Sequence, residues 1–177
     1  MQFSLDHDTQ ILARTPRVLR AMLSDLDPRW TDADYGPGTW SPRQIVAHYL
    51  DNELTDWIPR LRWILEHADA KPFPPYDRQS LKVFADLALD ELLDRFEAAR
   101  ADSLTVLRAQ PIDDAFLARR GEHPALGPVT MGELLAAWVA HDLHHIGHIA
   151  KALAHQHRDE AGPWRAYLSV LDPPAPR

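Results

Sequence analysis

Histidines at two places in this sequence have the chemistry and spacing to hold a divalent metal ion. His141, His144, His145 and His148 lie within eight positions, and His48 lies far upstream of them. Residues four apart are neighbours on one face of a helix, so two imidazoles at that spacing can chelate one ion, as they do in His-Glu-x-x-His zinc helices. Because the chain has no cysteine, the other ligands would have to be imidazole, carboxylate or water.

Helical geometry distinguishes between the four clustered histidines. At about 100° per residue, with His141 placed at zero, His145 lies at about 40°. Both fall inside an arc of about 160° that leucine, isoleucine and tryptophan side chains occupy, so both are expected to point into the protein. His144, at about 300°, lies beside charged residues and is expected to face solvent, while His148 lies at the edge of the arc. The candidate for a third ligand is His48.

A metal ion is not the only explanation for these histidines. A buried histidine is more often a hydrogen-bonded core residue, and a histidine cluster can also be a solvated face or an adventitious nickel site. A bare pair of histidines four residues apart is therefore a weak signal. The burial expected for His141 and His145 favours a metal on that pair, with His144 and His148 as the alternative pair.

Several polar and aromatic residues are placed where they could support a metal or line a pocket. Asp51 and Asn52 follow His48 by three and four positions and could orient its ring. Asp142 falls inside the apolar arc, and a buried carboxylate needs a partner. It is therefore expected to hold a ligand imidazole or an arginine from another helix. Trp138 is expected to pack beside the metal or to line a pocket.

The elements that must carry these residues are predicted from the positions of apolar residues, proline and glycine. Apolar side chains at helical spacing predict four long helices and a short one near the end, and no alternating pattern predicts a strand. The expected helices span about 5–26, 41–68, 80–108, 130–157 and 164–171. Segments rich in Pro, Gly and Asp predict loops at 27–39, 70–79, 110–129 and 159–163, and the tail at 170–177 is expected to fray.

Local signals fix some helix boundaries and predict two distortions. Ser41 is a good N-cap before Pro42, and Thr130 opens a Thr-Met-Gly-Glu capping box. Pro16 and Pro59 lie inside predicted helices, where each removes one backbone hydrogen bond, so a kink or break is expected at Pro16 and a bend at Pro59. Long helices with loops of roughly 10 to 20 residues predict an all-α four-helix bundle that has some long crossovers.

Composition limits the class of protein. The chain has 177 residues, 45% of them hydrophobic, which suits one domain over residues 1–177 with a sizeable core. No apolar stretch is long enough to cross a membrane and no secretory signal is evident, so no membrane partner is expected. Together with the absence of cysteine, this predicts a cytoplasmic location. A net charge of −7 and the lack of a run of Lys and Arg argue against a nucleic-acid partner.

Two segments resemble the signatures of a known family. Thr-Trp-Ser-Pro-Arg-Gln-Ile-Val-Ala-His-Tyr-Leu-Asp-Asn-Glu, at residues 39–53, looks like the second-helix signature of the DinB/YfiT-like superfamily of damage-inducible proteins. His-Asp-Leu-His-His-Ile-Gly-His, at residues 141–148, resembles its fourth-helix signature, in which His-x3-His is followed by one residue, Gly and Gln. The order of predicted helices is similar over nearly the whole chain.

The resemblance implies an up-down-down-up four-helix bundle that holds one divalent metal ion, commonly zinc or nickel. Carried over position by position, the ligands are His48, His141 and His145, with water or substrate in the remaining positions. His148 stands where the family usually has glutamine, and it could line the mouth of the pocket or hydrogen-bond a bound ligand. A small-molecule substrate and a homodimer are also implied.

Three functions agree with such a site. Three neutral protein ligands leave a metal its full charge and an open position, which favours catalysis. Because the family includes bacillithiol S-transferases and mycothiol-dependent maleylpyruvate isomerases, the favoured hypothesis is an S-transferase or isomerase that uses a low-molecular-weight thiol activated by the metal. The alternatives are a hydrolase that uses metal-activated water, for which no general base is obvious, and a non-catalytic metal-binding stress-response protein. Catalytic residues beyond the metal ligands cannot be assigned from the sequence.

Overall fold

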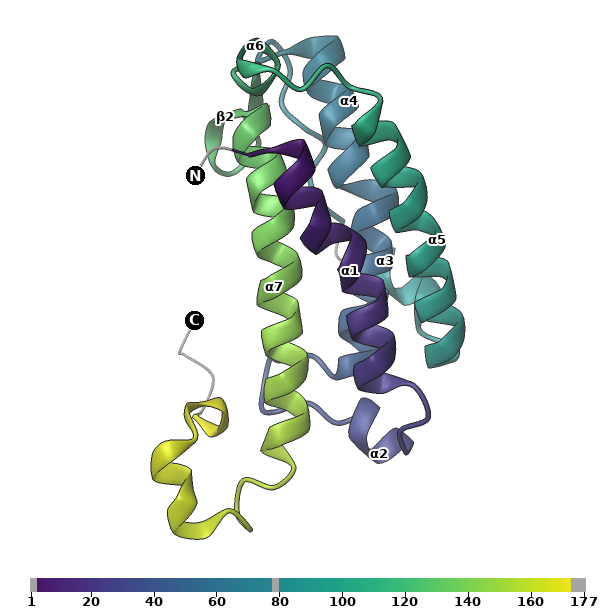
Figure 1. The fold of residues 1–177 in the computed structure, drawn as a ribbon, viewed down its shortest axis with the longest axis vertical. Helices are drawn as coiled ribbons and strands as arrows, with labels where there is room; N and C mark the ends of the chain where they lie inside the picture. The colour runs from purple at the N-terminus through teal and green to yellow at the C-terminus, as the bar shows by residue number, and fades with distance from the viewer. Residues whose placement is uncertain (1–2, 78–79, 173–177) are drawn as a thin grey trace.

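The computed structural model describes residues 3–77 and 80–172, which form an all-α four-helix bundle with a small hairpin at one end (Figure 1). The α-helices are α1 (Leu5–Leu23), α2 (Pro28–Thr31), α3 (Pro42–Thr55), α4 (Trp57–His67), α5 (Leu89–Arg108), α6 (Asp114–Leu117) and α7 (Met131–His155). The remaining elements are the 3-10 helices η1 (Ser80–Phe84), η2 (Gly162–Tyr167) and η3 (Ser169–Leu171), and the strands β1 (Arg120–His123) and β2 (Gly127–Thr130).

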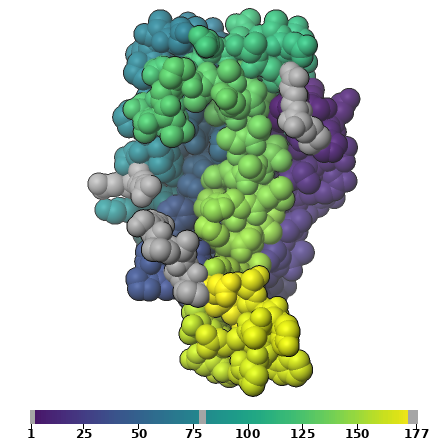
Figure 2. Space-filling model, turned by 90° about the vertical axis from the view of Figure 1, so that its left-hand side faces the viewer, coloured from purple at the N-terminus to yellow at the C-terminus, as the bar shows by residue number. Residues whose placement is uncertain are grey.

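Four columns build the bundle: α1, the stacked pair α3 and α4, α5, and α7. In Figure 1, α1 and α7 run downward, whereas α3, α4 and α5 run upward, so a long crossover after α4 returns the chain to the lower end. α1 and α3 each pack against both α5 and α7. Figure 2 shows α7 lying between α1 and the α3–α4 column on one face, with η2 and η3 beyond the end of the bundle. The predicted up-down-down-up order is confirmed.

The helix starts that depend on local chemistry are confirmed. Ser41 accepts from the Gln44 backbone N–H at 3.3 Å, and the Gln44 side chain accepts from the Ser41 N–H at 3.0 Å, which completes a capping box. At the start of α7, Thr130 and Glu133 form the predicted box, with Glu133 accepting from the Thr130 N–H at 2.7 Å. These two caps begin the two helices that carry the clustered histidines.

Pro59 divides the predicted helix 41–68 into two helices. The break lies at Asp56, with φ −115° and ψ −71°, rather than at the proline itself. A proline cannot donate to the carbonyl four residues earlier, and its ring collides with that carbonyl. That residue is Thr55, the last of α3. The helical path therefore ends four residues before Pro59 and resumes at once as α4.

Pro16 distorts α1 without breaking it. The helix is continuous from Leu5 to Leu23, three residues short of the predicted end, and Figure 1 shows it changing direction near its middle. Pro16 has no N–H for the Leu12 carbonyl, which Arg100 of α5 satisfies instead, with Nη1 donating at 2.8 Å. A partner on another helix thus compensates for the hydrogen bond that the proline removes.

The third predicted helix is shorter than its apolar pattern indicates. Only η1 forms at residues 80–84, and α5 begins at Leu89 after the extended residue Ala88, with φ −62° and ψ 152°. Phe84 packs against the core although it lies outside the long helix. The helical spacing between Phe84 and the apolar residues of α5 therefore reflects burial against α3 and not a continuous helix. Of the predicted loop 70–79, residues 78 and 79 lie outside the described residues.

The predicted loop 110–129 contains α6 and the antiparallel hairpin of β1 and β2. Each strand has four residues, too short for an alternating pattern to stand out. The hairpin packs on α4 at Gly121, where an added Cβ would lie 2.7 Å from Cγ1 of Ile64. A larger residue at this position would push the hairpin off α4.

The end of the chain also differs from expectation. The predicted short helix at 164–171 is two 3-10 helices, and Leu171, only 5% exposed, packs where η3 meets α7. Fraying was expected from residue 170; residues 170 and 171 belong to η3, while residues 173–177 lie outside the described part. None of the helices described has both the length and the apolar character needed to cross a membrane.

The bundle core consists of two apolar clusters with a charged layer between them. One cluster includes Leu104 of α5 and the other includes Phe96, and Arg100 lies between these two residues along the same helix. Arg100 is 1% exposed and pairs with Asp142 at 2.6 Å and with Glu53 at 2.8 Å. Of the two partners expected for Asp142, the arginine from another helix is the one observed. The ion pairs of this layer join α3, α5 and α7, and the hydrogen bond from Arg100 to the Leu12 carbonyl adds α1.

Candidate metal centre

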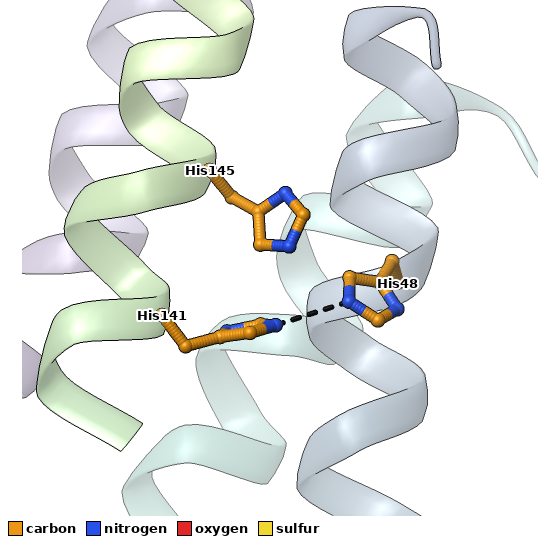
Figure 3. Close-up of side chains that lie close together, drawn as sticks. All are labelled: His48, His141 and His145. Atoms are coloured by element: carbon orange, nitrogen blue, oxygen red, sulfur yellow. Dashed lines mark hydrogen bonds between the residues drawn. The ribbon is translucent and has the colours of Figure 1, made fainter. Parts of the chain in front are cut away.

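His48 of α3 and His141 and His145 of α7 point toward one another across the interface between the two helices (Figure 3). One ring nitrogen of each lies within 4.8 Å of those of the other two, and the Nε2 atoms of His48 and His141 are 3.0 Å apart. Imidazole nitrogens around a tetrahedral zinc ion, at 2.0–2.1 Å from it, would be about 3.3 Å from one another. The nitrogens of His48 and His141 thus have nearly the separation of two ligands of one ion, and a nitrogen of His145 is near enough to be a third candidate.

The position of each histidine around α7 decides which ones meet. His145 is 7% exposed and His141 is half-buried, whereas His144 is exposed and His148 half-buried, in agreement with the helical-wheel expectation. The rings of His144 and His148 lie 4.0 Å apart on the outer side of this cluster. The geometry therefore brings His48 together with the inward pair, His141 and His145.

The charge state of the two α7 histidines suits metal binding. Burial, reinforced by the neighbouring histidines, lowers the pKa of His141 to about 3 and that of His145 to about 2. Both rings are therefore neutral near pH 7, the form that binds a metal. Within the described residues the Nδ1 atoms of both rings lack a hydrogen-bond partner. A set of neutral, partly unsatisfied imidazoles fits a divalent transition metal, because imidazole binds zinc, nickel, iron and copper alike.

Tyr76 connects the triad to a buried carboxylate. Its hydroxyl donates to Asp51 Oδ2 at 2.6 Å and lies 3.2 Å from Nδ1 of His48. Since the single hydroxyl proton goes to Asp51, the phenol oxygen accepts from Nδ1–H of His48, which leaves Nε2 with its lone pair toward the other histidines. Asp51 was expected to orient His48 directly, whereas it reaches the ring through Tyr76. No local signal in the sequence identifies Tyr76, because it reaches the site only through the fold of its loop.

Asn52 lies inside the cluster rather than beside it. Its Nδ2 atom is 3.3 Å from Nε2 of His48 and 3.0 Å from Nε2 of His141. The side chain is 3% exposed, and within the described part of the chain its Oδ1 atom has no hydrogen-bond partner. Asn52 was expected to orient the ring of His48 alone, but it contacts a histidine from each helix.

Aromatic rings surround the three histidines. Trp40 lies 4.7 Å from His48 and stacks on His145 at 6.0 Å, and Trp57 lies 5.1 Å from His141, measured between ring centroids. Trp138 stacks on the far side of Trp57 at 5.7 Å and is fully buried, so it supports the aromatic wall and does not line an open pocket. This wall keeps bulk water from much of the triad.

A pocket of about 220 Å³ lies next to the site, between α4 and residues 74–77. Tyr76 lines this pocket and also contacts His48. Pro59 and Trp63 give it an apolar wall, and Arg60 lines it while paired with Asp56. Tyr76 is thus the residue that this pocket shares with the surroundings of His48.

Fold and site together define a four-helix bundle with three clustered histidines on its second and fourth columns. Residues 11–149 match the family model of the DinB superfamily. Because the match covers most of the chain, the protein belongs to this superfamily. The resemblance noted in the two histidine segments is therefore confirmed.

Individual relatives carry names that agree with a metal site. A protein of Oceanobacillus iheyensis is 28% identical over 137 residues, which cover 76% of this chain and 77% of the relative. A Bacillus cereus protein is 26% identical over 148 residues, which cover 82% of this chain and 83% of that relative. Both bear the provisional name of metal-dependent hydrolase. The solved structure of YfiT from Bacillus subtilis shares the fold, with a TM-score of 0.70 and 24% identity over 86% of this chain and 87% of that one.

Proposed function

We propose that His48, His141 and His145 hold one divalent ion, zinc or nickel, and that the protein is an S-transferase or isomerase that uses a low-molecular-weight thiol. The observation that supports the metal is the convergence of three imidazoles from two helices, two of which burial keeps neutral. A divalent ion bound there would lower the pKa of a thiol or water in contact with it. The choice between a thiol and water as the nucleophile depends on the residues around the triad.

The buried carboxylates around the triad are already engaged, which favours a thiol over water as the nucleophile. Asp51 accepts from Tyr76, and Glu53 and Asp142 pair with Arg100. A hydrolase normally needs a general base within hydrogen-bond reach of the attacking water. A thiol needs no such base once its proton has been lost to solvent. The three carboxylates thus serve to orient His48 and to hold the bundle together.

The pocket beside Tyr76 suits the electrophilic substrate. Its apolar wall can hold the body of a small molecule, while Arg60 could attract a polar or anionic group. In the transfer step the sulfur would form a bond to an electrophilic carbon, and the leaving group would depart with its electron pair and take a proton from solvent. The residues of the chain would position both partners, with Trp40 and Trp57 excluding water.

Cobalt-loaded protein provides a direct test of thiol binding. Addition of glutathione, cysteine or bacillithiol is expected to produce a thiolate-to-cobalt charge-transfer band, which His145→Ala protein should lack. If wild-type protein binds cobalt but gives no band with any of these thiols, the thiol proposal is wrong and only the metal site remains.

Hydrolysis is the second candidate because the relatives bear the provisional name of metal-dependent hydrolase. The arrangement of Asp51 and Tyr76 near His48 could in that case accept a proton from water. Metal-dependent release of acid from an ester or amide panel, in the complete absence of thiol, would favour this function. A requirement for thiol would exclude it for that substrate.

Replacing Tyr76 with phenylalanine is expected to weaken zinc binding by about 10- to 100-fold, because residues that orient a ligand imidazole typically contribute that much. The substitution removes only the hydroxyl that joins Asp51 to His48. Competition with a chromophoric chelator measures the change. Tyr49→Phe is the control, because the Tyr49 hydroxyl donates to the backbone carbonyl of Asp142 and to no imidazole. An equal loss in both variants would show that Tyr76 has no specific role.

A further inference from the structure

The two helices that form the candidate metal centre each present a pair of polar residues four positions apart. On α7 the pair is His141 and His145, and on α3 it is His48 and Asn52. Side chains with this spacing lie one above the other on a helix face. The site thus contains four inward side chains, two from each helix, although only three of them are histidines.

The Nδ2 atom of Asn52 lies at ligand spacing from two of the three histidines. It lies 3.3 Å from Nε2 of His48 and 3.0 Å from Nε2 of His141. Those separations match the distance of about 3.3 Å between neighbouring ligand atoms of a tetrahedral zinc ion. A residue that only supported a ligand from outside would contact the far nitrogen of the ring, as Tyr76 does at Nδ1 of His48.

We infer that the side-chain carbonyl oxygen of Asn52 is a fourth protein ligand of the metal, which completes a set of three imidazole nitrogens and one amide oxygen. This inference rests on the proposed three-histidine metal site. Without metal, Nδ2 of Asn52 faces Nε2 of both imidazoles, which share one hydrogen bond with each other. An ion at the centre would require a lone pair on each Nε2 and would repel the NH2 group, and a half-turn of the amide would bring Oδ1 to the same place.

The surroundings of Asn52 permit this half-turn. Oδ1 has no hydrogen-bond partner within the described residues, so turning the amide breaks no bond on that side. The side chain is 3% exposed, and an unpaired amide oxygen at such depth carries a desolvation cost that binding a cation would offset. A neutral oxygen ligand also binds more weakly than imidazole. A thiol or substrate could therefore displace Asn52 or add beside it without removal of a histidine.

Two substitutions separate a ligand from a hydrogen-bond donor. Asn52→Leu removes both polar atoms, and zinc affinity is expected to fall at least about tenfold. Asn52→Asp keeps an oxygen but loses the NH2 group, so it should bind zinc at least as tightly as wild type if the oxygen is the ligand. A leucine variant that binds zinc as tightly as wild type, or an aspartate variant as weak as the leucine variant, overturns the inference.

A measurement on unmodified protein avoids any effect of the substitutions on folding. Asn52 is the only asparagine in the sequence, so selective labelling of asparagine gives a single side-chain amide in an NMR spectrum. Zinc is expected to shift the Asn52 carbonyl carbon strongly. Zinc binding without that shift overturns the role of Asn52 and leaves the three-histidine site intact, whereas wild-type protein that binds no zinc overturns both.

Discussion

Replacing Arg100 with methionine is expected to lower the free energy of unfolding by about 3–5 kcal/mol, the usual cost of removing one partner from a buried ion pair. Arg100 is 1% exposed and holds Glu53 and Asp142, whose side chains are fully buried. Burial alone would lower the pKa of Arg100, but the charges of Asp142 and Glu53 outweigh it and raise that pKa. Methionine would leave both carboxylates unpaired and the Leu12 carbonyl without its donor. Urea denaturation of metal-free protein, followed by circular dichroism, measures the loss.

Arg20→Met is the matched control for this prediction. Arg20 also contacts two carboxylates, Asp94 and Glu97, but all three side chains are substantially exposed. Exposed pairs usually contribute less than about 1 kcal/mol, so this variant should remain near wild type. If Arg100→Met lost no more stability than Arg20→Met, the charged layer would not be what joins α3, α5 and α7.

The parts of the fold that could be predicted are those fixed by local chemistry. The capping box at Thr130 and the N-cap at Ser41 depend on residues within four positions, so the sequence alone identifies both helix starts. The apolar pattern shows neither the break before Pro59, which follows from the missing N–H and the ring of that proline, nor the start of α5 at Leu89, after Phe84. In both places an apolar pattern continues although the helix does not, because burial and helix continuity are separate requirements.

In the candidate site too, some residues could be predicted from local sequence and others could not. The helical period identified His141 and His145 as the inward pair and Asp142 as a buried acid in need of a partner. It could not identify that partner as Arg100, because any arginine on a neighbouring helix would satisfy the requirement. Tyr76 could not be found either, because a loop places it and loop conformation has no period. Residues that distant segments contribute to the site thus cannot be identified from the sequence pattern.

Replacing His145 with alanine is expected to reduce bound metal from about one ion per chain to nearly none, because an alanine leaves only two imidazoles of the proposed ligand set. The same loss is expected for His48→Ala, although the two residues lie on different helices. Elemental analysis of untagged protein measures the metal content. In the wild type, chelation should also lower the melting temperature, since a ligand present at 100 times its Kd stabilises the native state by about 2.7 kcal/mol.

His144→Ala is the control that distinguishes the two possible histidine pairs on α7. His144 is exposed and stands one position from His145, so its removal changes the composition of the cluster without affecting the inward triad. Metal content and the effect of chelation should both stay at the wild-type level. If His144→Ala lost the metal and His145→Ala kept it, the ion would be held by the outer pair, His144 and His148. The proposed site would then be wrong, because it consists of the inward pair and of His48, which lies beside that pair.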